Sequence, residues 1–232
     1  MKSQTYRHLK NLSDSYQLAE SHLNYLIKIR DEFDFKPVVI YDIGACVLHW
    51  TNSAKLVWPD SRYFLFDAME ESEELFIESG HDYNIGVLGD EDGKKITFYK
   101  NVESPGGNSY YRENQQHSIV ADRFYGNKEN QFERIMRTLD SVVLEKKYPL
   151  PDLLKLDVQG CEVDILNGAK NIIKETRHLI VELQHVEYNI GAKMVNESIP
   201  IIESMGFKLF AEKFSLSSHA DADYHFINKK FI

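Results

Sequence analysis

The chain has 232 residues, of which 43% are hydrophobic and 12% aromatic, so it can bury a substantial core as one domain over residues 1–232. Its formal net charge is −9 and its basic residues occur as isolated pairs rather than as a stripe, which disfavours a nucleic-acid partner. No apolar run reaches the length of a membrane span, the start lacks the apolar region of a signal peptide, and the two cysteines show neither zinc nor disulfide spacing. We therefore expect a cytoplasmic protein without a membrane span.

The first part of the chain combines helical sequence with buried strands. Residues 1–15 are polar enough for disorder, whereas an apolar stripe predicts a helix over residues 16–33. We therefore expect an N-terminal helical extension over residues 1–36. Near-continuous apolar runs, typical of parallel strands covered on both faces, follow at 38–43, 62–68 and 83–89, and an alternating run at 94–100 predicts a short strand beside the third.

Residues 101–135 interrupt this rhythm with Pro, Gly and Asn and are predicted to form a loop. Beyond the loop, helices are predicted over 137–147, 165–173 and 200–206, the last with Pro200 in its first turn. Buried strands are predicted at 151–160 and 178–185, and two final strands at 207–213 and 223–230 have no helix between them. The pattern predicts an α/β fold, in which a mostly parallel sheet has helices on both faces and a C-terminal antiparallel hairpin.

The turn after the first strand, in "PVVIYDIGACVLHWT" (37–51), contains a single glycine. Asp42, Gly44 and Ala45 stand at the end of this strand, and Asp67 and Ala68 at the end of the second. Ligands of open α/β sheets bind beyond these strand ends, where the Asp67 carboxylate can accept hydrogen bonds from both hydroxyls of a ribose. A pyrophosphate needs several glycines, but S-adenosylmethionine has no phosphate and asks only for a close turn and nearby negative charge. We therefore predict that these five residues bind S-adenosylmethionine.

The turn "VLGDEDG" (87–93) ends the third predicted strand and adds a third acidic group at the same edge of the sheet. Asp90 can accept the adenine amino group, with Leu88 beside it. An ordinary polar turn is the alternative reading of these residues. Three acids at three successive strand ends favour a cofactor site.

Several segments, in order, resemble the FkbM-type S-adenosylmethionine-dependent methyltransferases: "VVIYDIGACVLHWT", "FLFDAMEE", "VLGDEDG", "RTLDSVV", "LLKLDVQGCEVDILNGAKNII" and "IVELQ". The resemblance covers roughly residues 37–230, and "KLDVQGCEVDILNGA" is its most specific part. It implies a Rossmann-like, seven-stranded methyltransferase fold and O-methylation, often of sugars or other hydroxylated metabolites. The chain departs from the family pattern at Cys46 and Leu48, where the family usually has Asn and Gly, and at Asp67, where it often has Glu.

Methyl transfer to a neutral hydroxyl needs a group that takes its proton or stabilises the alkoxide. Asp157 ends the fourth buried strand, and Glu182 and His185 lie in or just after the fifth, so adjacent strands are expected to bring the three together. His185 can act as a base near neutral pH. Alternatively, Asp157 and Glu182 can hold Mg²⁺ or Mn²⁺, which would bind the substrate oxygen. The sequence leaves both mechanisms open, beside the plain reading of a turn aspartate and a strand-end histidine.

The loop 101–135 is the expected wall for the acceptor, because Asn108, Ser109 and Tyr110 combine hydrogen-bonding groups with an aromatic face suited to a sugar ring. A surface loop without function is the alternative. We predict an S-adenosylmethionine-dependent O-methyltransferase that acts on a glycan or another small hydroxylated acceptor. A nicotinamide oxidoreductase, disfavoured by the weak glycine motif, and a cofactor-binding module without catalysis are the other classes.

Overall fold

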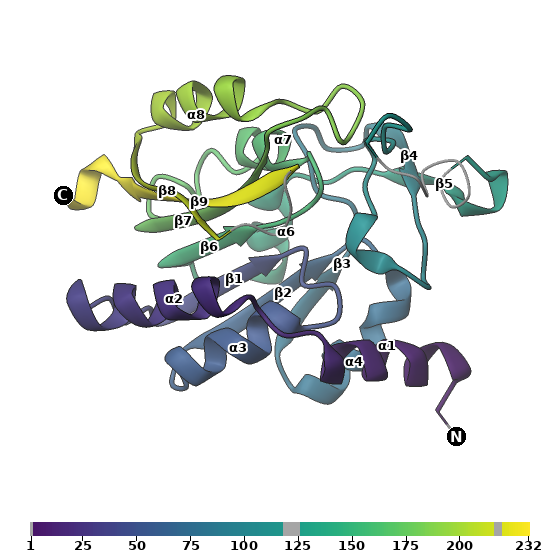
Figure 1. Ribbon diagram of the computed structural model, residues 1–232, viewed down its shortest axis with the longest axis horizontal. Helices are drawn as coiled ribbons and strands as arrows, with labels where there is room; N and C mark the ends of the chain where they lie inside the picture. The colour runs from purple at the N-terminus through teal and green to yellow at the C-terminus, as the bar shows by residue number, and fades with distance from the viewer. Residues whose placement is uncertain (1, 118–125, 216–219) are drawn as a thin grey trace.

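The computed structural model describes residues 2–117, 126–215 and 220–232, so residues 118–125 of the predicted acceptor loop lie outside the described part. Its centre is a seven-stranded sheet with the strand order β3-β2-β1-β6-β7-β9-β8 (Figure 1). Its strands, in chain order, are β1 (Val39–Ile43), β2 (Arg62–Asp67), β3 (Asp82–Ile85), β6 (Leu153–Leu156), β7 (His178–Gln184), β8 (Phe207–Ser215) and β9 (Asp221–Asn228).

The pairing of these strands confirms the predicted fold class. β1 pairs with β2 and β6, β2 with β3, and β6 with β7, all in parallel. β9 lies between β7 and β8 and is antiparallel to both, so the chain ends in the expected antiparallel hairpin. The result is a mostly parallel, Rossmann-like methyltransferase sheet.

Helices cover both faces of the sheet (Figure 1). Residues of α1, α2, α3 and α4 pack with one face, and residues of α6, α7 and α8 pack with the other. None of these helices, nor any other in the described part of the chain, is long and apolar enough to cross a bilayer. The helices are α1 (Gln4–Ser15), α2 (Glu20–Glu32), α3 (His49–Val57), α4 (Glu73–Ser79), α6 (Leu139–Lys146), α7 (Glu162–Asn167) and α8 (Val195–Ser204).

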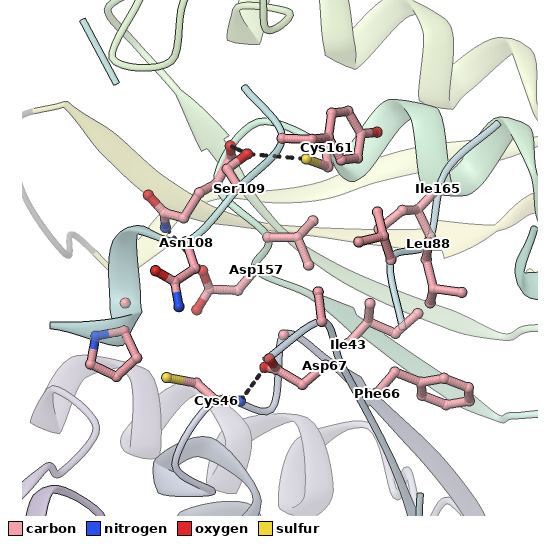
Figure 2. A pocket seen from close by; sticks show the side chains of 18 of the residues that line it. Ile43, Cys46, Phe66, Asp67, Leu88, Asn108, Ser109, Asp157, Cys161 and Ile165 are labelled. Carbon is pink, nitrogen blue, oxygen red and sulfur yellow. Dashed lines mark hydrogen bonds between the residues drawn. The ribbon is translucent and has the colours of Figure 1, made fainter. Parts of the chain in front are cut away.

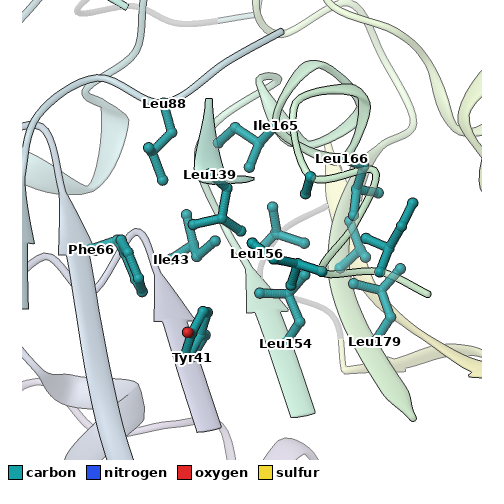
Figure 3. Packing of buried hydrophobic residues seen from close by; sticks show 14 of the residues in the cluster. Tyr41, Ile43, Phe66, Leu88, Leu139, Leu154, Leu156, Ile165, Leu166 and Leu179 are labelled. Atoms are coloured by element: carbon teal, nitrogen blue, oxygen red, sulfur yellow. The ribbon is translucent and has the colours of Figure 1, made fainter. Parts of the chain in front are cut away.

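Each buried strand contributes side chains to two hydrophobic cores, because successive side chains of a strand point to opposite faces of the sheet. Tyr41 and Leu179 belong to the core under α6 and α7 (Figure 3), whereas Ile40 and Ile180 belong to the core under α2 and α3. Strands buried on both faces read as continuous apolar runs, which is why the sequence revealed them.

Residues 94–100 form a strand, as predicted, but the strand does not pair with the predicted neighbour. β4 (Lys95–Tyr99) does not extend the main sheet beside β3 but pairs antiparallel with β5 (Gln131–Ile135) in a separate two-stranded sheet. Its alternating pattern indicates one buried face, and the second half of the predicted loop supplies the partner strand. Residues 101–135 are therefore not all loop.

Three predicted helix boundaries also differ from the structure. The polar start forms α1, because Ser3 caps it and Leu9 is fully buried. α7 ends at Asn167, and the next residue, Gly168, lies so close to Gly89 that a Cβ there would be 2.0 Å from the Gly89 carbonyl oxygen. α8 begins at Val195, so Pro200 lies inside the helix and not in its first turn.

A series of hydrogen-bonded rings joins the N-terminal helices to the C-terminal strands. Tyr25 of α2 bonds Nδ1 of His225 at 2.9 Å, and Nε2 of His225 bonds Nδ1 of His178 at 2.8 Å. Burial lowers the pKa of His178 to about 4, with a smaller effect from Arg177, and it lowers the pKa of His225 to about 3. Both imidazoles are therefore neutral in the folded protein at pH 7.

We expect His178 to make the fold sensitive to acid. In the unfolded chain His178 is protonated below its ordinary pKa of 6.5, whereas in the folded protein it is protonated only below about pH 4. Between these two pH values the unfolded state binds the extra proton, so the free energy of unfolding decreases as the pH falls. Between pH 7.5 and 5.5 this single group should remove about 1.4 kcal/mol of unfolding free energy. Urea unfolding of the wild type and of His178→Gln at both pH values measures it.

The variant comparison is needed because other groups titrate with the opposite sign. Burial raises the pKa of Glu162 to about 7, so protonation of this carboxyl stabilises the folded state over the same window. The wild type should lose about 1.4 kcal/mol more than His178→Gln between the two pH values. Equal losses in the two proteins would contradict the assignment.

Candidate active site

A cavity of about 260 Å³ lies at the carboxyl ends of β1, β2, β6 and β7. This is the edge at which open α/β sheets bind their ligands. Figure 2 shows Phe66, Leu88 and Ile165 on one side of the cavity and Cys46 and Asn108 on the other. The polar groups of the lining include Tyr16, His49, Asp67, Asn108, Ser109, Tyr110, Asp157, Gln159 and Glu182.

The turn after β1 needs its one glycine for space. Gly44 has a φ of +80°, and a Cβ at this position would lie 1.8 Å from the carbonyl oxygen of Asp157. Cys46 and Leu48 also have left-handed φ angles, +49° and +69°, although neither residue favours them. The turn thus keeps a backbone suited to Asn and Gly at the two positions where the chain departs from the family pattern.

Asp67 lies where the sequence placed it, at the end of β2 and facing the cavity. Its Oδ2 accepts the backbone N–H of Cys46 at 2.7 Å (Figure 2), and its Oδ1 accepts that of Met69 at 2.8 Å. Burial raises the pKa of Asp67 to about 6, against the effect of these two hydrogen bonds and of Lys155. Each carboxylate oxygen retains a second lone pair for a ligand hydroxyl. Gly44, Ala68 and Leu88, which the sequence predicts to contact the cofactor, also line the cavity.

Asp42 has a different place from the one expected. It is fully buried and does not line the cavity as described; its Oδ1 lies 3.0 Å from Nζ of Lys155, and its Oδ2 accepts the hydroxyl of Thr51 at 2.6 Å. Asp42 and Lys155 stand opposite each other on the paired strands β1 and β6. Ala45 is also buried outside the lining. These two residues support the turn rather than face a ligand.

The Lys155 ammonium connects Asp42 to Asp157. Nζ of Lys155 is 3.6 Å from Oδ2 of Asp157, whose side chain is 27% exposed, whereas those of Asp42 and Lys155 are 0% and 2% exposed. Burial alone would lower the pKa of Lys155, but Asp42 and Asp157 raise it above its ordinary value. The ammonium therefore stays charged behind the cavity, and one of its two partners reaches the cavity.

Asp157 and Glu182 come together as predicted. Gln159 Nε2 donates to Oδ1 of Asp157 at 3.2 Å and to Oε2 of Glu182 at 2.8 Å. Burial would raise the pKa of Asp157, but chiefly Lys155, with hydrogen bonds from Glu182 and Gln159, holds it below its ordinary value. The pair thus presents an ionised carboxylate beside a second carboxyl group in the same cavity.

Two other predicted site residues lie elsewhere. Nε2 of His185 bonds the Tyr224 hydroxyl at 2.8 Å, and the cavity lining as described does not include His185. The reason is the strand period, because Glu182 and His185 are three residues apart and point to opposite faces. Asp90 also lies outside the lining and forms a surface ion pair with Lys94 at 3.2 Å.

The donors at Asp157 and Glu182 are few for a metal ion. Within the described residues, no group of three or more His, Cys, Asp or Glu side chains is arranged to hold one. Two carboxylates can bind Mg²⁺ only if water or substrate completes its six ligands. Lys155 already neutralises one of the two carboxylates.

Asn108, Ser109 and Tyr110 do line the cavity, but most of their polar groups are engaged within the protein. Ser109 Oγ donates to the carbonyl of Gln159 at 2.8 Å, and the Tyr110 hydroxyl donates to Asp164 at 3.0 Å. Asn108 Oδ1 accepts a backbone N–H at 2.6 Å. These hydrogen bonds fix the three side chains in the wall of the cavity, so their main effect is on the shape of the cavity.

Sequence reasoning did not single out four residues of the site. Tyr16, from the turn between α1 and α2, and His49, the first residue of α3, line the cavity, as does Gln159. Lys155 lies behind them. A charged residue inside the apolar run "LLKL" was the available signal, since a buried lysine needs a partner. Nothing in the sequence pointed to Tyr16, because it reaches the cavity only through the packing of the N-terminal helices.

The sequence also matches a known family. A profile of the methyltransferase FkbM domain matches residues 42–209, most of the chain. The chain belongs to the FkbM methyltransferase family. It is accordingly a methyltransferase, and the nicotinamide oxidoreductase reading loses its support. A comparison with curated protein sequences gave no significant match.

The chain is also similar, at low sequence identity, to solved structures of methyltransferases. The methyltransferase FkbM from Methylobacillus flagellatus KT is 12% identical, with a TM-score of 0.50, over 96% of this chain and 59% of its own. Precorrin-6y C5,15-methyltransferase from Geobacter metallireducens GS-15 is 9% identical, with a TM-score of 0.47, over 93% and 96% of the two chains. Human N-acetylserotonin methyltransferase, solved in complex with SAM, is 10% identical, with a TM-score of 0.49, over 97% and 55%.

We expect the buried ion pairs of Lys155 to be essential for the stability of this FkbM domain. Lys155→Met leaves Asp42 buried and uncompensated and should lower the free energy of unfolding by about 3–5 kcal/mol. Urea unfolding measures the loss. Lys94→Met, which breaks the exposed pair with Asp90, is the matched control and should cost about 0–1 kcal/mol. Similar losses in both variants would show that the buried network contributes no more than a surface pair.

Proposed function

We propose that the protein is an S-adenosylmethionine-dependent O-methyltransferase acting on a hydroxyl of a small acceptor or of an exposed sugar. The observation that carries the proposal is a single cavity that contains both Asp67, at the end of β2, and the Asp157–Glu182 pair, at the ends of β6 and β7. The first carboxylate suits a ribose, and the second group suits proton removal from an acceptor.

The residues of the cavity fit this cofactor better than a dinucleotide. The described lining contains neither Lys nor Arg, so it offers no cationic clamp for a pyrophosphate. Phe66, Val87, Leu88 and Ile165 provide an apolar end for an adenine ring. The close approach of Gly44 to Asp157 leaves the tight turn that a cofactor without phosphates needs.

When bound, S-adenosylmethionine supplies a methyl group that is already activated as a sulfonium, so the protein's main task is orientation. We assign Asp157 to the acceptor hydroxyl: its ionised carboxylate accepts the hydroxyl hydrogen bond and takes the proton as the oxygen attacks. Because its pKa lies below the ordinary value, full proton transfer before attack is unfavourable. Gln159 holds the carboxylate in position through its bond at 3.2 Å.

The size and charge of the site support a small acceptor group. A volume of about 260 Å³ falls below the usual range of roughly 300–1,000 Å³ for ligand pockets. Such a cavity encloses little beyond the cofactor, so the acceptor would enter by its hydroxyl-bearing edge, past the wall that includes Asn108 and Ser109. The acidic site and a net charge of −9 disfavour nucleic acid as the acceptor.

Asp67 should control cofactor affinity. We expect Asp67→Ala to raise the dissociation constant of S-adenosylhomocysteine at least about tenfold, because hydrogen bonds to a carboxylate contribute about 1.5–3 kcal/mol. Wild-type affinity should also weaken below about pH 6, where the raised pKa of Asp67 allows the carboxyl to be protonated. Isothermal titration calorimetry measures both effects.

Asp90→Ala is the matched control, since Asp90 also follows a strand end but lies outside the cavity. Its affinity should equal that of the wild type. An unchanged dissociation constant in a folded Asp67→Ala variant would remove Asp67 from the cofactor site. Weakening by Asp90→Ala alone would show that the ligand occupies a different surface.

Asp157 should control turnover rather than cofactor binding. Once an acceptor is found with a panel of sugars and other hydroxylated compounds, Asp157→Asn should reduce kcat by about 10²–10⁴-fold. Activity should persist in EDTA, because Lys155 already neutralises Asp157 and no third His, Cys, Asp or Glu of the described residues joins the pair. His185→Ala serves as the control and should retain near-normal turnover, since His185 bonds Tyr224 instead. Loss of activity in EDTA that Mg²⁺ restores would assign the pair to a metal site.

A further inference from the structure

His49 is the one imidazole in the described lining of the cavity, and the proposed chemistry does not use it. It is the first residue of α3 and follows directly the left-handed turn at Leu48. The ring of Tyr16 meets it edge-on, with 6.2 Å between ring centroids and 84° between ring planes. Segments before and after β1 therefore hold this ring at the wall of the site.

The two nitrogens of His49 have different surroundings. Nδ1 is buried and has no hydrogen-bond partner among the described residues. A neutral imidazole carries one N–H, and an N–H buried without an acceptor costs the full desolvation of a donor. An unpaired acceptor at Nδ1 also has a cost, but only the tautomer with its hydrogen on Nε2 lets the ring donate a hydrogen bond into the cavity. Since Nδ1 is buried, the ring meets the cavity through its other edge, and Nε2 is the nitrogen left to serve as a donor there.

The same arrangement argues against His49 as a general base. A histidine that takes a proton needs an acceptor for its second N–H, usually a carboxylate or a carbonyl, and Nδ1 of His49 has none among the described residues. Burial and the Lys155 charge also lower its pKa, outweighing the opposite effect of Asp157 and Asp42. The ring thus remains a neutral hydrogen-bond donor.

A neutral donor at this wall suits an anionic oxygen. The described lining has no Lys or Arg, so a carboxylate ligand in this cavity depends on neutral hydrogen-bond donors. We propose that Nε2–H of His49 binds the α-carboxylate at the amino-acid end of S-adenosylmethionine. The inference rests on the proposed function and extends it, since it assigns one cofactor group to one side chain.

Calorimetry with two ligands separates this contact from the rest of the site. S-adenosylhomocysteine contains the amino-acid end, whereas 5′-deoxy-5′-methylthioadenosine retains the adenosine and lacks the carboxylate. His49→Phe keeps an aromatic ring against Tyr16 but removes the donor, and His49→Gln restores an amide N–H. We expect His49→Phe to weaken S-adenosylhomocysteine about tenfold and leave methylthioadenosine unchanged, while His49→Gln stays within about threefold of the wild type for both.

Each other result overturns the inference. An equal loss for both ligands would make His49 a structural wall residue, and unchanged binding of S-adenosylhomocysteine would remove it from the site. Should His49→Phe fail to fold, a tenfold loss in His49→Gln for both ligands alike has the same meaning. A wild-type protein that binds methylthioadenosine as tightly as S-adenosylhomocysteine would refute the carboxylate contact alone, and one that binds neither would refute the proposed function together with it.

Discussion

The ion pairs of Lys155 are the constraint on which the site depends. The lysine stands opposite Asp42 across the β1–β6 pairing and reaches Asp157 at the end of its own strand, with its side chain only 2% exposed. A charge in the middle of a sheet is tolerated only when its partners neutralise it. The register of β1 and β6 places Lys155 between Asp42 and Asp157. The same lysine keeps Asp157, the carboxylate that faces the cavity, ionised.

The turns at the strand ends then build the cavity around this charge. Gly44 passes within contact distance of the Asp157 backbone, and the Asp67 carboxylate holds the next part of the turn by accepting the Cys46 N–H. Cys46 and Leu48 keep left-handed φ angles that cost free energy. Burial of Leu48 in the core under α2 and α3 offsets that cost. The conformation of this turn thus depends more on its contacts with Asp157, Asp67 and the core than on the intrinsic preferences of Cys46 and Leu48.

The polar walls of the site come from segments that are distant in sequence. Tyr16 arrives from the N-terminal helices, and Ser109 from the insert before β5, where it is fixed by its bond to the Gln159 carbonyl. Tyr16 and Ser109 both line the cavity of about 260 Å³. These two walls of the cavity therefore come from elements outside the main sheet.

The sequence by itself determined the sheet and the residues that end its parallel strands, because strands buried on both faces require continuous apolar runs and parallel strand ends must meet at one edge. Asp67, Gly44, Asp157 and Glu182 were found in this way. Tertiary structure alone decided which side chains face the cavity: Asp42 turned inward to Lys155, and His185 pointed to the opposite face. It also brought in His49, which lies within a segment that resembles the family but had no role predicted from the sequence. The physical reason is that facing depends on pairing partners and on the alternation along a strand, and both are set by contacts between segments far apart in the chain.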